Sequence, residues 1–250
     1  MDSTAIVIGV LSLAPFLVQR FTRKFIYFAV FALIAIVAHG LYLYGPHILY
    51  LLGVTYILST AAELMSLKTP YNVFGVTYRY DTNHAFFASN IRLLGVYPIE
   101  ISFAWVIFKY VSFNLAVIIV SAFAMPYWWE VVFIPLILVS VDFIIDPVAV
   151  HTVRLWHWER GSAYFGIPWQ NFLGWYLVGL VTTLMFLWLS PVKTVRFDYL
   201  LILPVLFYAS LLNNMPRLFS LDKQLSIVAI TPLTAWTAVA AAGLWILSRG

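Results

Sequence analysis

The feature that most limits what this chain can fold into is a succession of apolar runs, each about as long as a membrane is thick. A helix needs ~20 residues to cross a bilayer. Runs of about that length lie at 4–19, 25–44, 47–66, 128–146, 169–190, 197–214 and 226–247. Hydrophobic residues make up 63% of the chain and charged residues 10%, and the mean hydropathy is +0.94, which a soluble domain cannot bury. We therefore predict an all-α, polytopic integral membrane helix bundle, with residues 1–250 as a single transmembrane domain.

The stretch 95–125 decides how many helices the bundle has. It is too long for one crossing and too short for two comfortable ones, so the chain has eight helices if it crosses once and nine if it crosses twice. With eight helices, the loop of Arg20, Arg23 and Lys24 lies on the same side of the membrane as the later basic residues. Those later residues are Arg154, Arg160, Arg217 and Lys223. Because Lys and Arg gather in cytoplasmic loops, we predict eight helices in the cell membrane, with that loop cytoplasmic. The first run lacks a basic leader and a cleavage pattern, so we predict a retained helix.

Composition also excludes several classes of function. The chain has no cysteine, so it has neither a disulfide framework nor a thiolate metal site. Its net charge of +4 is scattered over loops, without a basic stripe for nucleic acid. His151 near two aspartates could suggest a metal, but the spacing matches no compact ligand pattern. We predict no metal and no organic cofactor.

Two carboxylates mark the most informative segment. Asp142 and Asp146 end an apolar run and lie four residues apart, so they share one helix face. An ionisable group in the bilayer centre costs about 2.5 to 3.5 kcal/mol, so both should face the protein interior. We expect Pro147 to break the helix, and a lid rich in aromatic and basic residues to follow. A second helix then opens at Pro168 and carries Asn171 and Trp175 on one face.

Two further acids lie within apolar runs, Glu63 in the third and Glu100 in the fourth. Acids in membrane helices are often functional, so we expect these four carboxylates and Asn171 to converge on one pocket. The alternative is structural, with Glu63 reaching the interface and Glu100 paired to a nearby base. The polar stretch 67–93 between them should be a loop or a re-entrant segment. Many of the tryptophans fit interfacial belts, but those near the carboxylates could line a cavity for a long apolar ligand.

These residues resemble the membrane-bound carotenoid 1,2-hydratase family, which includes the bisanhydrobacterioruberin hydratases of archaea. The resemblance covers roughly residues 50 to 180 and rests on Glu63 and four motifs. The motifs are KTPYNVFGVTYRY (68–80), LLGVYPIEISFAW (93–105), VDFIIDP (141–147) and YFGIPWQNFLGW (164–175). The chain departs from the family pattern at Thr69-Pro70, where the family has Thr-Gly, and at Gly-Val-Tyr-Pro in place of Gly-Val-Pro. An acid at the position of Glu100 is also less usual.

The resemblance implies that the protein adds water to the terminal double bond of an acyclic carotenoid end group. A buried carboxylic acid would protonate the alkene, aromatic faces would stabilise the cation, and a second polar group would orient the water. It implies catalytic roles for Asp142, Asp146, Glu63, Glu100 and Asn171, with the two aspartates preferred as the acid and base pair. The predicted substrate-binding residues are Tyr78, Tyr80, Trp105, His151, Trp156 and Trp175. The partners implied are the lipid bilayer, a long isoprenoid substrate and other carotenoid biosynthesis enzymes.

Two alternatives stay open. Pro98, Glu100 and Phe103 resemble the Pro-x-Glu motif of the small membrane lycopene cyclases, in which protonation leads to ring closure. The other is a protein that binds or transports carotenoids or lipids and does no chemistry, although no internal repeat of the kind found in transporters is evident. Transfer to a diphosphate substrate is disfavoured, since an aspartate-rich magnesium motif is absent.

Overall fold

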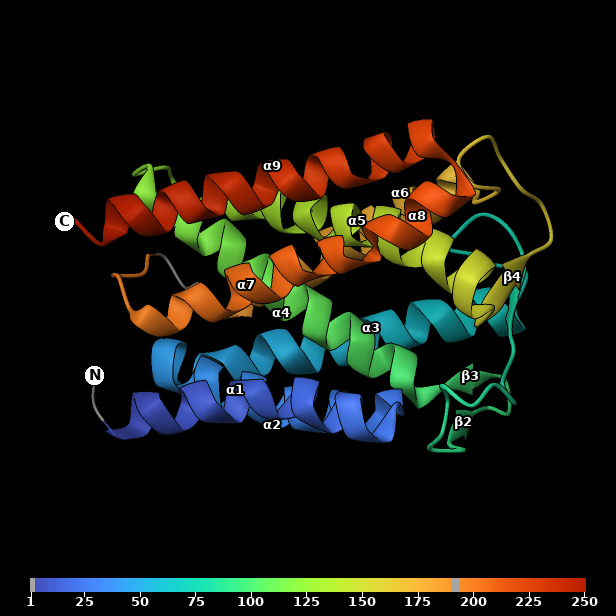
Figure 1. Cartoon of the computed structure of the whole chain (residues 1–250), viewed down its shortest axis with the longest axis horizontal. Helices are drawn as coiled ribbons and strands as arrows, with labels where there is room; N and C mark the ends of the chain where they lie inside the picture. The colour runs from blue at the N-terminus through green and yellow to red at the C-terminus, as the bar shows by residue number, and fades with distance from the viewer. Residues whose placement is uncertain (1–2, 190–193) are drawn as a thin grey trace.

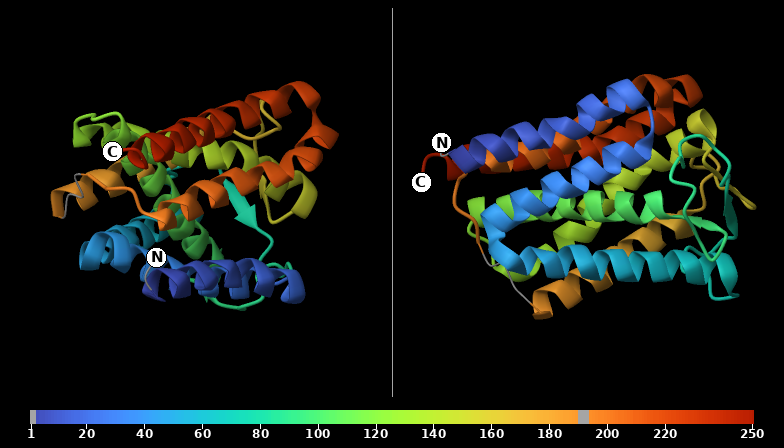
Figure 2. Two further views of the ribbon diagram at one scale, coloured as in Figure 1. Left: turned by 60° about the vertical axis from the view of Figure 1, so that its left-hand side comes forward. Right: turned by 90° about the horizontal axis from the view of Figure 1, so that it is seen from below.

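The computed structural model describes residues 3–189 and 194–250, and within them it is a bundle of long helices with one irregular end (Figure 1). Seven continuous helical stretches in this described part are long and apolar enough to cross a membrane. The longest has 44 residues, Phe25–Lys68, and reverses at the short turn Gly45–His47 (Figure 2). It therefore holds two helices, and the described chain has eight helical segments long enough to cross a membrane, the number predicted.

The N-terminal half contains α1 (Ser3–Thr22), α2 (Phe25–Tyr44), α3 (Ile48–Lys68) and α4 (Ile99–Ala122). The stretch 95–125 is thus one helix and crosses once. It passes diagonally through the middle of the bundle and contacts α2, α3, α5, α7 and α9 (Figure 1). The diagonal path explains the length of α4, because a tilted helix needs more residues to cross the same thickness.

The C-terminal half contains α5 (Glu130–Pro147), α6 (Trp169–Leu189), α7 (Ile202–Ser210), α8 (Met215–Leu221) and α9 (Lys223–Leu247). Short 3-10 turns at Tyr127–Trp129, Tyr199–Leu201 and Leu211–Asn214 precede α5, α7 and α8. The last residue of the predicted run 169–190 lies outside the described residues.

Two long loops meet at one end of the bundle. The first joins α3 to α4 and contains β1 (Tyr78–Tyr80), β2 (Arg92–Leu93) and β3 (Tyr97–Pro98), so the predicted loop 67–93 is a loop with short strands. The second joins α5 to α6 and contains β4 (Trp156–Trp158). The α1–α2 turn lies at the same end, where Phe25 stacks on Phe86 at 4.7 Å. The basic residues of these connections therefore share one side, as predicted for eight helices; their cytoplasmic orientation stays a prediction.

α5 ends at Pro147, as expected, but the chain does not leave the helical path there. The chain continues from it as a π-helical turn, Val148–Val153, which ends at Arg154 in a left-handed conformation (φ 64°). Proline lacks the N–H that an α-helix needs, but its φ of −56° still fits helical geometry. A π-turn is wider than an α-turn and often lies at a functional site. Here it redirects the chain from α5 into β4.

Candidate active site

The lid over this end of the bundle is a two-stranded ribbon made by the two long loops. Strands β1 and β4 pair antiparallel, with Tyr78 opposite Trp158 and Tyr80 opposite Trp156. Because side chains alternate along a strand, these four aromatic residues share one face, and they line a cavity beneath the ribbon. Arg79 and its partner His157 occupy the other face and are exposed. The lid therefore presents aromatic rings inward and charge outward.

Asp142 and Asp146 both face this cavity and are buried, with 1% of each residue exposed. Asn171, in the first turn of α6, joins them: its amide nitrogen donates to Oδ2 of Asp142 at 2.7 Å and to Oδ2 of Asp146 at 2.8 Å. The other oxygen of Asp146 accepts a hydrogen bond from the indole N–H of Trp156 at 2.6 Å. The helix pair predicted from the sequence is thus joined through a single amide.

Glu63 approaches the cavity from α3 and accepts three hydrogen bonds. The indole N–H of Trp105 donates to Oε1 at 3.1 Å, and the hydroxyl groups of Tyr78 and Tyr80 both donate to Oε2, the latter at 2.9 Å. Burial raises the pKa of the Tyr78 and Tyr80 hydroxyls well above the ordinary value of a phenol, and the nearby Glu63 carboxylate raises it further. The phenols therefore stay protonated and serve as donors.

The floor of the site is a stack of two tryptophans. Trp105 of α4 and Trp175 of α6 lie with ring centroids 3.8 Å apart and planes 19° apart. Phe74, on the loop after α3, packs against α6 at Gly174, where an added Cβ would lie 2.4 Å from the Phe74 ring. Glycine at this position therefore lets the first loop pack directly on the helix that carries Asn171.

The cavity enclosed by these side chains has a volume of about 30 Å³. Nine of the eleven predicted site residues line it or contact a lining residue. Those that line it are Glu63, Tyr78, Tyr80, Asp142, Asp146, Trp156, Asn171 and Trp175, and Trp105 joins through Glu63 and Trp175. The lining also includes Phe74, Ile101 and Trp158, which were not predicted. Of these, Trp158 could have been found, since it lies two residues after Trp156 and so on the same strand face.

Glu100 and His151 do not join the cavity, contrary to the prediction. Glu100 lies in the first turn of α4, where Oε1 accepts the Ser89 backbone N–H at 2.9 Å, so it ties the first loop to the helix. His151 lies on the π-turn and forms a hydrogen bond with the carbonyl of Phe165 at 2.6 Å. In the described part of the chain, no group of three or more His, Asp or Glu side chains is placed to hold a metal ion.

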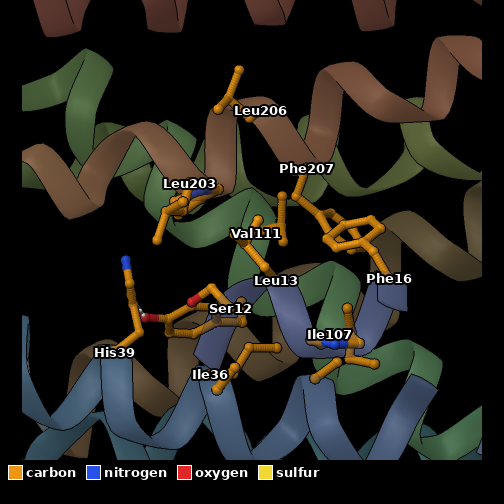
Figure 3. Close-up of a pocket in the computed structure, with 15 residues that line it drawn as sticks. Ser12, Leu13, Phe16, Ile36, His39, Ile107, Val111, Leu203, Leu206 and Phe207 are labelled. Carbon is orange, nitrogen blue, oxygen red and sulfur yellow. Dashed lines mark hydrogen bonds between the residues drawn. The ribbon is translucent and has the colours of Figure 1, made fainter. Parts of the chain in front are cut away.

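A second, larger cavity of about 160 Å³ lies between α1, α2, α4 and α7 (Figure 3). Its polar lining groups bond to the protein: His39 contacts the Tyr110 hydroxyl and the Leu200 carbonyl, and Ser12 donates to the Ile8 carbonyl at 2.9 Å. No carboxylate is among its described lining residues. It therefore offers hydrocarbon volume but no acid.

Comparison with known proteins bears on the family of this chain. Over a segment of 46 residues, 18% of this chain, the sequence is 44% identical to the bisanhydrobacterioruberin hydratase of Haloarcula japonica. The matched segment spans 15% of that protein's length. No solved structure matches the chain. The model of a family described as carotenoid biosynthesis proteins matches residues 24–242. This match covers most of the chain, which therefore belongs to the carotenoid biosynthesis protein family.

Proposed function

We propose that this protein adds water to the terminal double bond of an acyclic carotenoid end group and yields a tertiary alcohol. Membership of a carotenoid biosynthesis family supports an isoprenoid substrate, and the partial similarity to a named hydratase supports the reaction. One observation carries the mechanism: Asp142 and Asp146 are joined by the Asn171 amide inside a cavity walled by aromatic rings. This arrangement suits a reaction that begins with a proton and passes through a carbocation.

The hydrogen bonds favour Asp142 as the proton donor. Within the described residues Asp142 accepts one hydrogen bond, Asp146 two and Glu63 three. Each donor stabilises the ionised form of a carboxylate, and two carboxylates sharing a dry site cannot both be charged without repulsion. The proton therefore belongs on the carboxylate with the fewest donors. Asp146 then remains ionised and can act as the base.

The proposed reaction balances without an external reagent. Asp142 gives its proton to the less substituted alkene carbon, which leaves a tertiary cation at the neighbouring carbon. The ring faces of Trp156, Trp158 and Trp175 stabilise this cation. A water molecule adds to the cation, Asp146 takes one of its protons, and that proton returns to Asp142. One water is consumed, and one C–H and one C–O bond form.

The cavity volume indicates that the site opens to admit the substrate. A cavity of about 30 Å³ has room for about two water molecules, and a branched isoprenoid end is larger. The structure therefore corresponds to a closed state whose cavity is too small for the substrate end group. We propose that the aromatic rings of the lid and floor separate when the end group enters.

The cyclase alternative has less support from the geometry. Its motif relies on Glu100, which is bound to the first loop and does not line the cavity. A cyclase also has to keep water away from its cation, whereas the polar wall of this cavity places three carboxylates and an amide around the reaction space. Water capture is the outcome that these groups favour.

Expression in a host that makes lycopene, followed by chromatography and mass spectrometry of the pigments, tests the proposal. We expect a product heavier than lycopene by one water per reacted end. The matched control is the same host carrying the Asp142→Asn variant. An isomer of unchanged mass would indicate cyclisation and contradict the proposal, as would unaltered lycopene in the presence of folded, membrane-inserted protein.

A further inference from the structure

A solvent-facing cleft adjoins the catalytic cavity on the outer side of the lid. This outer cleft has a volume of about 660 Å³ and lies between β1, β4 and the π-turn, lined by charged groups that include Arg79, Asp81 and Arg154. A second cleft of about 560 Å³ lies on the other flank of the lid, around Gly75 and Glu159. The two clefts differ in how they relate to the cavity.

The outer cleft and the cavity share two lining residues. Tyr80 and Trp156 line both spaces, whereas the second cleft shares no described lining residue with the cavity. The strand register places these two residues opposite each other, with ring centroids 5.7 Å apart and planes 72° apart. This pair of rings, the partition, therefore lies between the outer cleft and the cavity.

The partition is bonded to the carboxylates that it covers. The Tyr80 hydroxyl donates to Glu63 at 2.9 Å, and the Trp156 indole N–H donates to Asp146 at 2.6 Å. Behind the partition, the indole N–H of Trp158 is buried beside the Asp146 carboxyl but makes no hydrogen bond of normal geometry among the described residues. Buried donors of this kind are usually satisfied by water. The cavity thus has both the volume and an unused donor for a water molecule.

We propose that Tyr80 and Trp156 form a gate through which water passes from the outer cleft into the catalytic cavity. The inference rests on the proposed hydration, because that reaction consumes water and the closed cavity holds about two molecules. A polar route from the outer cleft would let water be replaced while an apolar end group occupies the cavity. Rotation of Trp156 would open the route and release its hydrogen bond to Asp146, the proposed base.

The absence of cysteine makes the gate testable by thiol labelling of the purified protein in detergent. Ile101→Cys places a thiol in the cavity wall, and Val150→Cys places one in the outer cleft. The probe is 2-aminoethyl methanethiosulfonate, a small water-soluble cation. With the lid unchanged, the cavity thiol should react slowly and the cleft thiol rapidly. Adding Trp156→Ala should speed labelling at the cavity thiol by ~10-fold or more, because exposure limits the rate.

Trp158→Ala is the matched control for this experiment. Trp158 lies on the same strand and lines the same cavity, but it does not line the outer cleft. It should therefore enlarge the cavity without opening the route, and labelling should stay slow. Equal acceleration by Trp158→Ala and Trp156→Ala would overturn the gate, and so would unchanged labelling in Trp156→Ala.

Three more variants distinguish opening of the partition from misfolding. Ala116→Cys, fully buried in α4, should stay unreactive in each background, since labelling there reports loss of the fold. If Trp156→Ala makes the Ala116→Cys thiol reactive, Tyr80→Ala takes its place as the variant that opens the partition. The same outcomes then decide. Trp156→Phe keeps a ring in the partition and should label slowly. Thiol labelling does not depend on turnover. A result that contradicts the gate is therefore distinguishable from a result that contradicts the proposed hydration.

Discussion

Replacing Asp142 by asparagine is the sharpest test of the proposed mechanism, because the structure separates its chemical effect from its structural one. The only hydrogen bond to Asp142 in the described residues comes from Asn171 and uses Oδ2. An amide keeps one acceptor oxygen, so Asp142→Asn can retain this bond in a nearly isosteric side chain. We therefore expect little change in stability. The proton, however, is lost, and removing a general acid costs about 10²- to 10⁴-fold in rate, or about 3 to 5 kcal/mol in the barrier.

Asp146→Asn should behave differently. Asp146 uses both oxygens, one for Trp156 and one for Asn171, and an amide can accept only one of these bonds. Loss of one buried hydrogen bond should lower the stability by about 1 to 3 kcal/mol, in addition to any loss of activity. Thermal unfolding in detergent and pigment conversion in the lycopene-producing host measure the two effects separately.

Two results would refute this reasoning. Full conversion by Asp142→Asn would show that the proton comes from another group, and full conversion by both aspartate variants would move the role to Glu63. Failure of both variants to fold would instead support a structural role, in which the aspartates hold α6 and the lid in place through Asn171 and Trp156.

Three further outcomes are expected. Asn171→Leu should reduce the hydrated product and raise unhydrated or cyclised isomers in pigment extracts, because both aspartates lose their shared donor; an unchanged product ratio would contradict this. Gly174→Ala should lower the unfolding temperature in detergent, since its Cβ would overlap the Phe74 ring and overpacking costs about 1 to 3 kcal/mol; a stable variant would show that the loop shifts freely. Lys109→Met should leave the unfolding temperature unchanged or higher. The Lys109 ammonium bonds only to Gly179 and Thr183 within the described residues, so its removal leaves no buried charge unpaired.

Local sequence patterns predicted the helices and part of the site. Apolar runs marked the eight passes because the bilayer fixes how many apolar residues a helix needs, and the single crossing at 95–125 followed from the placement of basic residues. Asp142, Asp146 and Asn171 were found because burying a polar group in a membrane is costly, and because the i, i+4 spacing places the two acids on one face.

The remaining features depended on contacts between distant segments. Nothing local to 78–80 or 156–158 shows that these segments pair, yet their register puts Tyr78, Tyr80, Trp156 and Trp158 on one inward face. Glu100 resembled Glu63 in sequence, but the angle at which α4 leaves the first loop turns Glu100 toward Ser89. Pro147 was expected to end α5 and does so, but the π-turn that continues the helical path after it was not foreseen. Composition and the spacing of apolar residues therefore determined which segments enter the membrane and which helix faces are polar. The crossing of the helices and the pairing of the two loops decided which polar groups share a cavity. Only such long-range contacts fix the relative positions of side chains that lie far apart in the chain.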